Sequence, residues 1–239
     1  MKLARRRRLC QRSGFMVHRL LVLLLAGSAL AANPTPRPNP ARFARDIATF
    51  AADRPEQGGI VFTGSSSIRL WTNLKQDFPD LPVLNRGFGG SVAHDLSVHF
   101  ETVVARHAPK LLVTYTGSND LNAKLTPDEA FADYTIFLDT FHTRFPKARV
   151  ILTSVKIGEK RLAQIPLVHE LNRKLQGWTA GRDWVRYLDC DSYLADSKGR
   201  PVRKFYRDDL LHLSEEGYAE WKKILEPVLR EEWAKVKDL

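Results

Sequence analysis

The segment Arg207–Ser214 holds the residues best suited to general base catalysis. It contains Asp209 and, three positions later, His212. A carboxylate at this spacing can fold back onto the imidazole and hold its Nδ1–H, which leaves Nε2 free to take a proton from a hydroxyl. A surface capping or salt-bridge pair is the alternative interpretation. Other histidines lie in segments that we predict to be helical, where structural roles are expected: His94, His99, His107, His142 and His169.

A hydroxyl that such an imidazole could activate occurs in the segment Gly64–Ile68, which reads Gly-Ser-Ser-Ser-Ile after an apolar run. A glycine followed by small polar residues permits a tight turn from strand to helix, and a serine there lies at the positive end of the helix. The backbone N–H groups of such a turn suit a developing oxyanion. An ordinary N-cap serine and a phosphate-binding loop like that of flavodoxins are the alternatives, and this segment alone does not decide.

Two further loops hold groups that could donate hydrogen bonds to a reacting oxygen. Residues 85–91 include three glycines in four positions, and Gly90 could present its backbone N–H at close range. Residues 116–120 include Asn119, whose amide offers two N–H donors. Such residues are also common in plain turns, so each signal is weak alone. The glycine loop departs from the spacing of a dinucleotide-binding fingerprint and does not follow the first strand.

These loops are spaced along a regular alternation of short apolar runs and amphipathic segments. The runs predicted to be buried strands are residues 60–63, 82–84, 111–115, 150–154 and 184–188. The segments predicted to be helices are residues 91–107, 127–145, 162–181 and 214–237. This alternation predicts an α/β fold, a three-layer α/β/α sandwich around a five-stranded parallel sheet. Ligands bind at the carboxyl ends of the strands in such folds, so the four loops should gather there.

The candidate residues occur in an order that resembles the pattern of the SGNH, or GDSL-type, serine hydrolases: Ser66, Gly90, Asn119, Asp209 and His212. The resemblance extends from about residue 60 to residue 218. Residues 61–71, 85–90 and 211–214 look like a subgroup related to platelet-activating-factor acetylhydrolase. The resemblance implies a flavodoxin-like fold and a serine esterase that needs no metal or cofactor. It also implies specific site residues. The triad would be Ser66, His212 and Asp209, and the oxyanion hole would comprise the N–H groups of Ser66 and Gly90 and the Asn119 amide.

The chain departs from the family pattern at Ser65, where the family usually has Asp before the nucleophile. Three adjacent serines result, and the spacing favours Ser66. Two alternatives to an esterase stay open. An acyltransferase would use the same residues, with a sugar hydroxyl in place of water. A non-enzymatic, flavodoxin-like protein would bind a phosphate or flavin at residues 64–67, and the pairing of Asp209 with His212 would then be coincidental.

The first 31 residues carry most of the chain's formal charge of +10. They hold seven Lys and Arg residues and no acid, so the remainder has 30 basic and 27 acidic residues, a net charge of +3. This distribution argues against a nucleic-acid partner. The basic stretch leads into the apolar run 20–25 and ends at Ala29-Leu30-Ala31, a pattern typical of a secretory signal peptide cleaved near Ala31. Translation could start at Met1 or at Met16.

We therefore expect three parts: a signal peptide over residues 1–31, an extended Pro-rich leader over residues 32–40, and one hydrolase domain over residues 41–239. The apolar run is too short for a stable membrane span, which needs roughly 20 residues. Export, to the periplasm or outside the cell, favours extracytoplasmic esters: acetylated glycans, short acyl esters or lysolipids. The loops 156–164 and 196–206 are expected to shape the substrate pocket. Cys190 stands between two carboxylates, so a structural role is expected.

Overall fold

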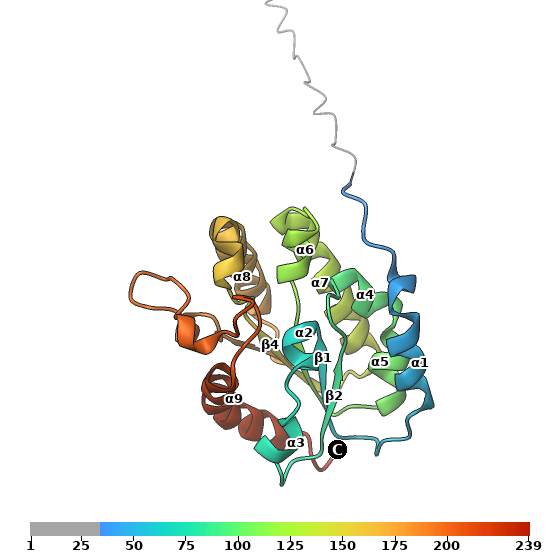
Figure 1. Ribbon diagram of the computed structural model, residues 1–239. Helices are drawn as coiled ribbons and strands as arrows, with labels where there is room; N and C mark the ends of the chain where they lie inside the picture. The colour runs from blue at the N-terminus through green and yellow to red at the C-terminus, as the bar shows by residue number, and fades with distance from the viewer. Residues whose placement is uncertain (1–33) are drawn as a thin grey trace, which may run out of the picture. The chain divides into compact units, whose positions relative to one another are not determined.

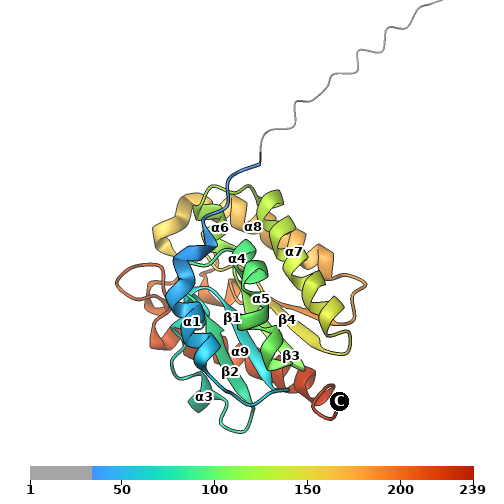
Figure 2. The ribbon, with the colours of Figure 1, turned by 90° about the vertical axis from the view of Figure 1, so that its right-hand side faces the viewer.

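The computed structural model describes residues 34–239, which form a central sheet with helices on both faces (Figures 1 and 2). The sheet has five parallel strands in the order β2-β1-β3-β4-β5. The strands are β1 (Ile60–Gly64), β2 (Val83–Gly87), β3 (Leu111–Tyr115), β4 (Arg149–Thr153) and β5 (Val185–Leu188). The predicted α/β sandwich with a five-stranded parallel sheet is confirmed, and each predicted strand lies within three residues of its observed bounds.

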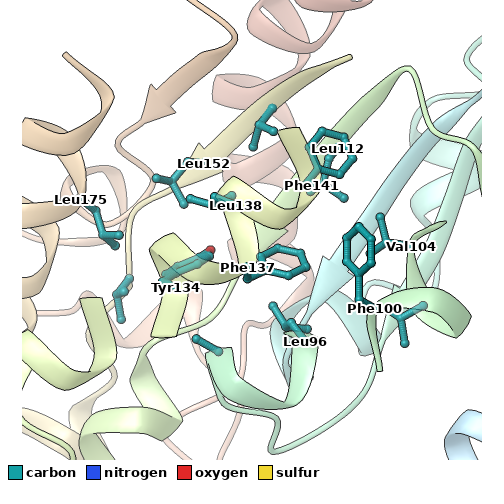
Figure 3. Close-up of a cluster of buried hydrophobic side chains, with 14 of the residues drawn as sticks. Leu96, Phe100, Val104, Leu112, Tyr134, Phe137, Leu138, Phe141, Leu152 and Leu175 are labelled. Atoms are coloured by element: carbon teal, nitrogen blue, oxygen red, sulfur yellow. The ribbon is translucent and has the colours of Figure 1, made fainter. Parts of the chain in front are cut away.

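The helices that cover one face of the sheet enclose a large apolar core (Figure 3). They are α1 (Ala44–Ala52), α4 (Ala93–Val98), α5 (Phe100–Val103), α7 (Pro127–Arg144) and α8 (Ile165–Thr179). The rings of Phe100 and Phe137 meet edge to face, with their centroids 6.1 Å apart. Alternate strand residues, Leu112 and Leu152 among them, point into this core, because successive side chains of a strand lie on opposite faces.

The opposite face is covered by α2 (Ser66–Arg69), α3 (Leu74–Asp77) and α9 (Glu215–Ala234). Trp71 lies at the centre of this second core. Its ring centroid lies 6.0 Å from that of Phe62 on β1 and 6.2 Å from that of Trp221 on α9. Both faces of β1, β3 and β4 are thus buried, which explains why these strands read as continuous apolar runs.

The prediction of one continuous helix over residues 91–107 is wrong. The segment forms three short helices instead: α4, α5 and the 3-10 helix η2 (Ala105–His107). His99 ends α4 in a non-helical conformation, and its Nε2 lies 3.1 Å from the Pro40 carbonyl oxygen. Val98, Thr102 and Val103 are β-branched residues with low helix propensity. Weak local preference and a tertiary contact together end the helix at this point.

The predicted helix over residues 162–181 starts three residues too early. The α-helix α8 begins at Ile165, and the residues before it form the 3-10 helix η3 (Glu159–Gln164). Pro166 explains the boundary, because a proline lacks an N–H donor and its ring clashes with the carbonyl four residues earlier. Proline is tolerated in the first turn of a helix, which is where Pro166 lies.

The other two predicted helices agree closely with α7 and α9. Thr126 caps α7 in a capping box with Glu129, whose carboxylate accepts a hydrogen bond from the Thr126 backbone N–H. Ser214 caps α9 by accepting a hydrogen bond from the Gly217 N–H at 3.1 Å. The short helices α1, α2, α3 and α6 (Ser118–Asn122), like η4 (Ser192–Leu194) and η5 (Arg203–Phe205), were not predicted separately.

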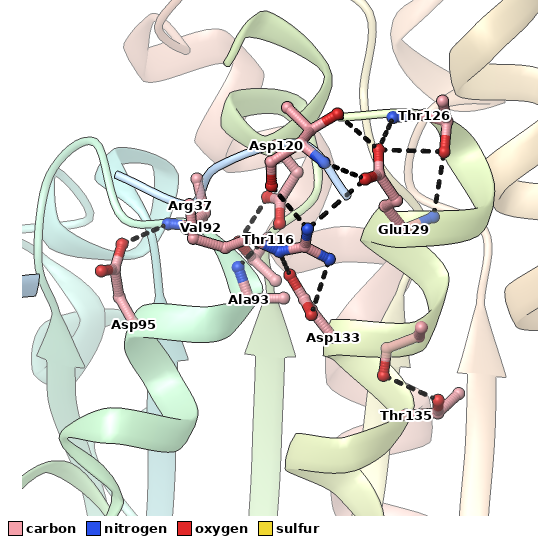
Figure 4. A network of polar contacts seen from close by, with 12 residues as sticks. Arg37, Val92, Ala93, Asp95, Thr116, Asp120, Thr126, Glu129, Asp133 and Thr135 are labelled. Carbon is pink, nitrogen blue, oxygen red and sulfur yellow. Dashed lines mark hydrogen bonds and ion pairs between the residues drawn. The ribbon is translucent and has the colours of Figure 1, made fainter. Parts of the chain in front are cut away.

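Residues 34–39 of the Pro-rich leader form no helix or strand, and η1 (Pro40–Phe43) follows them. Two of its residues nevertheless bind α7 (Figure 4). The Thr35 backbone N–H donates to Glu129, and the Arg37 guanidinium donates to both oxygens of the Asp133 carboxylate, at 2.8 and 3.2 Å. Contacts with the domain thus start about six residues before the predicted boundary at residue 41.

The predicted signal peptide, residues 1–31, lies outside the described residues. Within residues 34–239, no helix combines the length and the apolar character needed to cross a bilayer.

Candidate active site

Ser66, His212 and Asp209 form one hydrogen-bonded chain. The Ser66 Oγ lies 2.9 Å from His212 Nε2, although the two residues are 146 positions apart in the sequence. The His212 Nδ1 lies 2.6 Å from Asp209 Oδ2. The structure therefore brings together the three residues predicted to form a triad.

Ser66 owes its position to a sharp turn at the end of β1. Gly64 ends the strand with a φ of +136°, and an ideal Cβ there would lie 1.9 Å from the Tyr115 carbonyl oxygen, so only glycine fits. The Ser65 N–H donates to that carbonyl at 3.0 Å. Ser66 is then the first residue of α2, which starts above β1 in Figure 1. Its hydroxyl and its backbone N–H both lie at the edge where the strands end.

The loop that carries the imidazole is folded around the Asp209 carboxylate. Asp209 Oδ1 accepts the backbone N–H groups of Leu211 and His212, each at 2.9 Å, and Leu210 has a φ of +60°. Partial burial opposes ionisation, but the hydrogen bonds from His212 and Leu211 outweigh it and hold the pKa of the Asp209 carboxyl well below its usual range. The ionised carboxylate accepts Nδ1–H, so Nε2 is the acceptor for the Ser66 hydroxyl.

A buried lysine donates a hydrogen bond to the backbone of the same loop. The Lys156 side chain is 3% exposed, and its Nζ donates to the Leu211 carbonyl oxygen at 2.5 Å. Burial lowers the pKa of Lys156 to about 7, against the opposing charge of Asp191. Lys156 thus fixes the backbone between the carboxylate and the imidazole. The one feature of the sequence that could have indicated this role is a lysine between two apolar residues, Val155 and Ile157, shortly after β4.

Three predicted oxyanion donors line one hollow of about 450 Å³ beside His212: Ser66, Gly90 and Asn119. Within residues 34–239, the backbone N–H groups of Ser66 and Gly90 donate to no other group. Gly90 has a φ of +87°, and an ideal Cβ on it would meet nothing within 4 Å. The space beside its Cα is therefore open, and neither N–H group is already engaged by a backbone acceptor among the described residues.

The orientation of the Asn119 amide is fixed from both sides. Its Nδ2 donates to the Ser91 carbonyl oxygen at 3.1 Å, and its Oδ1 accepts a hydrogen bond from Arg161 Nη2 at 3.1 Å. The guanidinium can only donate, so Oδ1 has to face it and Nδ2 has to face the Ser91 carbonyl oxygen. One of the two Nδ2 hydrogens is left for a ligand.

A buried carboxylate ties the loops of Gly90 and Asn119 together (Figure 4). Asp120 is fully buried and accepts the backbone N–H groups of Ala93 and Gly117 at 2.8 and 3.0 Å. Burial raises the pKa of Asp120 to about 7, although both hydrogen bonds oppose this shift. In the sequence, the pair Asn119-Asp120 is typical of a turn, and nothing there marks Asp120 as part of a site. The structure shows that it sets the spacing between two sides of the hollow.

The hollow is also lined by three charged residues that were not predicted from the sequence: Asp46, Arg69 and Arg161. Arg161 comes from the loop 156–164, which was expected to shape the pocket. The expectation for the loop 196–206 is wrong, because none of its residues lines this hollow. Asp196 and Gly199 border a separate cavity of about 480 Å³ beside α8 and the end of β5.

Cys190 lies away from the hollow, within the second core. It is 1% exposed, and burial raises the pKa of its thiol far above the usual value, with further contributions from Asp189 and Asp191. A thiol in this state is a poor nucleophile, as expected.

Residues 57–220 match the model of the GDSL-like Lipase/Acylhydrolase family. None of the curated proteins compared with the chain matches it.

Solved structures share the fold at low identity. A candidate platelet activating factor from Streptococcus pneumonia has a TM-score of 0.70 at 19% identity, with 78% of this chain and 92% of that chain covered. A GDSL-like lipase from Bacteroides thetaiotaomicron VPI-5482 has a TM-score of 0.66 at 18% identity, covering 81% and 98%. A variant of an acetyl-xylooligosaccharide esterase from Geobacillus Stearmophilus has a TM-score of 0.58 at 16% identity, covering 75% and 96%. These likenesses establish the fold alone.

Proposed function

Because the chain belongs to the GDSL-like lipase/acylhydrolase family of carboxylic ester hydrolases, we propose that Ser66 is the nucleophile of an ester hydrolysis that proceeds through an acyl-enzyme. The observation that carries this proposal is the hydrogen-bonded chain from Asp209 through His212 to Ser66, beside a hollow lined by the predicted oxyanion donors. This arrangement supports serine ester hydrolysis, which needs a nucleophile, a general base and oxyanion donors at one place.

In the first half-reaction, Ser66 Oγ attacks the ester carbonyl carbon while His212 Nε2 takes its proton. The Asp209 carboxylate stabilises the imidazolium that forms. The negative charge that develops on the carbonyl oxygen is met by the N–H groups of Ser66 and Gly90 and by the Asn119 amide. The imidazolium then protonates the departing alcohol oxygen, and the acyl group stays on Ser66.

In the second half-reaction, water replaces the alcohol. His212 Nε2 takes a proton from the water as its oxygen attacks the acyl carbonyl carbon. The same donors hold the second oxyanion. When that intermediate collapses, the proton returns to Ser66 Oγ and the carboxylic acid is released.

The size and character of the hollow favour short acyl groups. It measures about 450 Å³ and is lined mainly by polar and charged side chains and glycine backbone, with Leu211 as its one large apolar residue. A long alkyl chain would gain little from such a lining, because its binding depends on apolar contact. We therefore propose acetyl or short-chain acyl esters as substrates. The esterase from Geobacillus Stearmophilus supports this choice, since its described activity is on acetylated xylooligosaccharides.

We further propose that the protein acts outside the cytoplasm. The support is the basic and apolar pattern of residues 1–31, which ends in small residues and lies outside the described structure. N-terminal sequencing of protein recovered from the cell envelope or the medium is expected to start near Ala32. Recovery of the uncleaved chain from the cytoplasm would contradict this proposal.

A panel of p-nitrophenyl esters from acetate to decanoate, together with acetylated xylooligosaccharides, tests the substrate proposal. We expect kcat/KM to be highest for acetate and to fall as the acyl chain lengthens. The Ser66→Ala variant serves as the control for contaminating esterases. Product analysis with and without a sugar acceptor separates release of the free acid from acyl transfer. Absence of turnover that depends on Ser66 for every ester would contradict the proposed function.

Replacement of Asn119 by alanine is expected to lower kcat by about 100- to 1,000-fold with a small effect on KM, the usual result of removing one oxyanion donor. The amide would bind the transition-state oxygen more strongly than the ground-state carbonyl, so the loss appears in kcat. Steady-state kinetics with p-nitrophenyl acetate measure it. Asn122→Ala is the matched control, because Asn122 is an exposed residue of the same short helix, α6. Equal kcat values for the two variants would remove Asn119 from the mechanism.

A further inference from the structure

Two guanidinium groups line the hollow that holds Ser66, and the proposed reaction uses neither as a reacting group. Arg161 enters from η3, and Arg69 is the last residue of α2. An ideal Cβ on Gly89 would lie 2.6 Å from Arg69 Nε, so the Arg69 side chain lies against the residue next to Gly90. The two cations thus approach the oxyanion donors from different elements, one beside the glycine loop and one beside Asn119.

Neither guanidinium forms an ion pair. In residues 34–239, no carboxylate lies within 4.0 Å of Arg69 or Arg161. The partners of Arg161 are neutral: its Nη1 donates to the carbonyl and the hydroxyl of Ser118, at 2.8 and 2.6 Å, and its Nη2 donates to Asn119. A partly buried charge without a counter-charge is costly, and burial lowers the pKa of Arg161. Such a cost is offset when a ligand brings the opposite charge.

The net charge of the lining favours an anion. Asp46 of α1 is the one carboxylate among the residues that line the hollow, against two guanidinium groups. Arg161 retains free donors on Nε and Nη2 beyond its three contacts. Arg69 is exposed and makes no hydrogen bond with another described residue through its side chain. Together they offer the hollow two sets of guanidinium donors, one on an exposed side chain and one on a partly buried side chain.

We propose that Arg69 and Arg161 make this enzyme selective for esters whose alcohol portion carries an anionic oxyacid group, a carboxylate or a phosphate. This inference rests on the proposed esterase function of Ser66. Guanidinium groups bind both oxyacids through paired N–H donors. The alcohol portion is the leaving group, and we assign Arg69 to it because Arg69 is the more exposed of the two guanidinium groups. The acyl portion would occupy the remainder of the small hollow.

Matched acetate esters test the charge preference directly. 4-Acetoxybenzoate carries a carboxylate, 4-acetoxyphenyl phosphate carries a phosphate, and 4-acetoxybenzamide is a neutral analogue of the first with nearly the same shape. Each kcat/KM is divided by the rate constant of the same ester in hydroxide alone, which removes differences in leaving-group reactivity. We expect the corrected value to be at least about 10-fold higher for one or both anionic esters than for the amide. The two anionic arms show which oxyacid is preferred.

Arginine variants and an aspartate variant are expected to shift that ratio in opposite directions. Arg69→Gln, and likewise Arg161→Gln, should bring the ratio of anionic to neutral ester toward one. Asp46→Asn should raise it, because the opposing carboxylate is lost while α1 presents Asp46 at its exposed surface. Arg161→Gln should also lower kcat for the neutral ester, since Arg161 orients Asn119, so the ratio is the relevant readout. Arg144→Gln is the control, because Arg144 ends α7 and borders a different cavity.

Salt gives an independent readout that a purely structural role would not move. The screening length falls from about 10 Å at 0.1 M to about 3 Å at 1 M ionic strength, so the anionic preference should shrink with added NaCl while the rate for the neutral ester stays nearly constant.

Three outcomes would overturn the inference: equal corrected values for the charged and neutral esters, a preference that survives in Arg69→Gln and Arg161→Gln alike, or a lower ratio in Asp46→Asn. Activity that depends on Ser66 in the same assays would show that the proposed function stands even when this inference fails.

Discussion

Replacement of Ser66 by alanine is expected to lower kcat/KM for p-nitrophenyl acetate by about 10⁴- to 10⁶-fold, the range seen when a serine nucleophile is removed. The variant loses the only hydroxyl that contacts His212 Nε2 among the described residues. The oxyanion donors and the hollow stay intact, so some acceleration over water should remain. Steady-state rates of the purified variant, measured at high enzyme concentration, give the size of the loss.

The neighbouring serine provides a stringent control. Ser65 is buried, and the contact that holds it is made by its backbone N–H to Tyr115 rather than by its side chain. Ser65→Ala should therefore keep activity within about threefold of the wild type, with an unchanged melting temperature. Loss of activity in Ser65→Ala together with full activity in Ser66→Ala would show that Ser66 is not the nucleophile.

Replacement of Asp209 by asparagine is expected to lower kcat by about 10³- to 10⁴-fold near neutral pH. The amide oxygen can still accept the N–H groups of Leu211 and His212, so the loop should keep its shape. The amide nitrogen, however, would donate to Nδ1 and force the proton onto Nε2, which faces Ser66. An imidazole in that tautomer cannot take the serine proton.

Asp208 is the matched control for this change, because it is the adjacent carboxylate and its side chain is fully exposed, paired with Arg203. Asp208→Asn is expected to keep full activity, since surface ion pairs contribute little. Comparable kcat values for Asp209→Asn and Asp208→Asn would show that Asp209 is not part of the mechanism.

The residue types and their order along the chain were sufficient to predict the fold and which of the proposed site residues lie close together. Continuous apolar runs mark strands buried on both faces, and the carboxyl ends of parallel strands lie at one edge. Loops that follow different strands, with Ser66, Gly90 and Asn119, were therefore expected to meet. The pairing of Asp209 with His212 depended on local spacing alone, and it too agrees with the structure.

Side chains that enter the site through tertiary packing were not predictable. Arg161 faces the hollow because Ser118 and Asn119 hold it, and Lys156 reaches Leu211 from 55 positions away. No local period or spacing encodes such contacts. The docking of Thr35 on Glu129 was missed for the same reason, since the two residues are 94 positions apart.

Prediction of helices from the local sequence also failed where a contact with a neighbouring element overrides the helix propensity of the segment. The segment 91–107 has an amphipathic pattern, but the contact of His99 with Pro40 and a run of β-branched residues interrupt the helix. The start of α8 was predictable in principle, because Pro166 excludes an α-helix that begins several residues before it.

Covalent labelling tests the central claim most directly. A fluorophosphonate reacts with a serine hydroxyl that a neighbouring base has activated and leaves a stable phosphonyl adduct, which peptide mass spectrometry can locate. The account predicts one adduct per chain, on Ser66, with labelling slowed strongly in His212→Ala and unaffected in Ser65→Ala. Labelling of a different residue, or labelling of Ser66 at an equal rate with and without the His212 imidazole, would contradict the account.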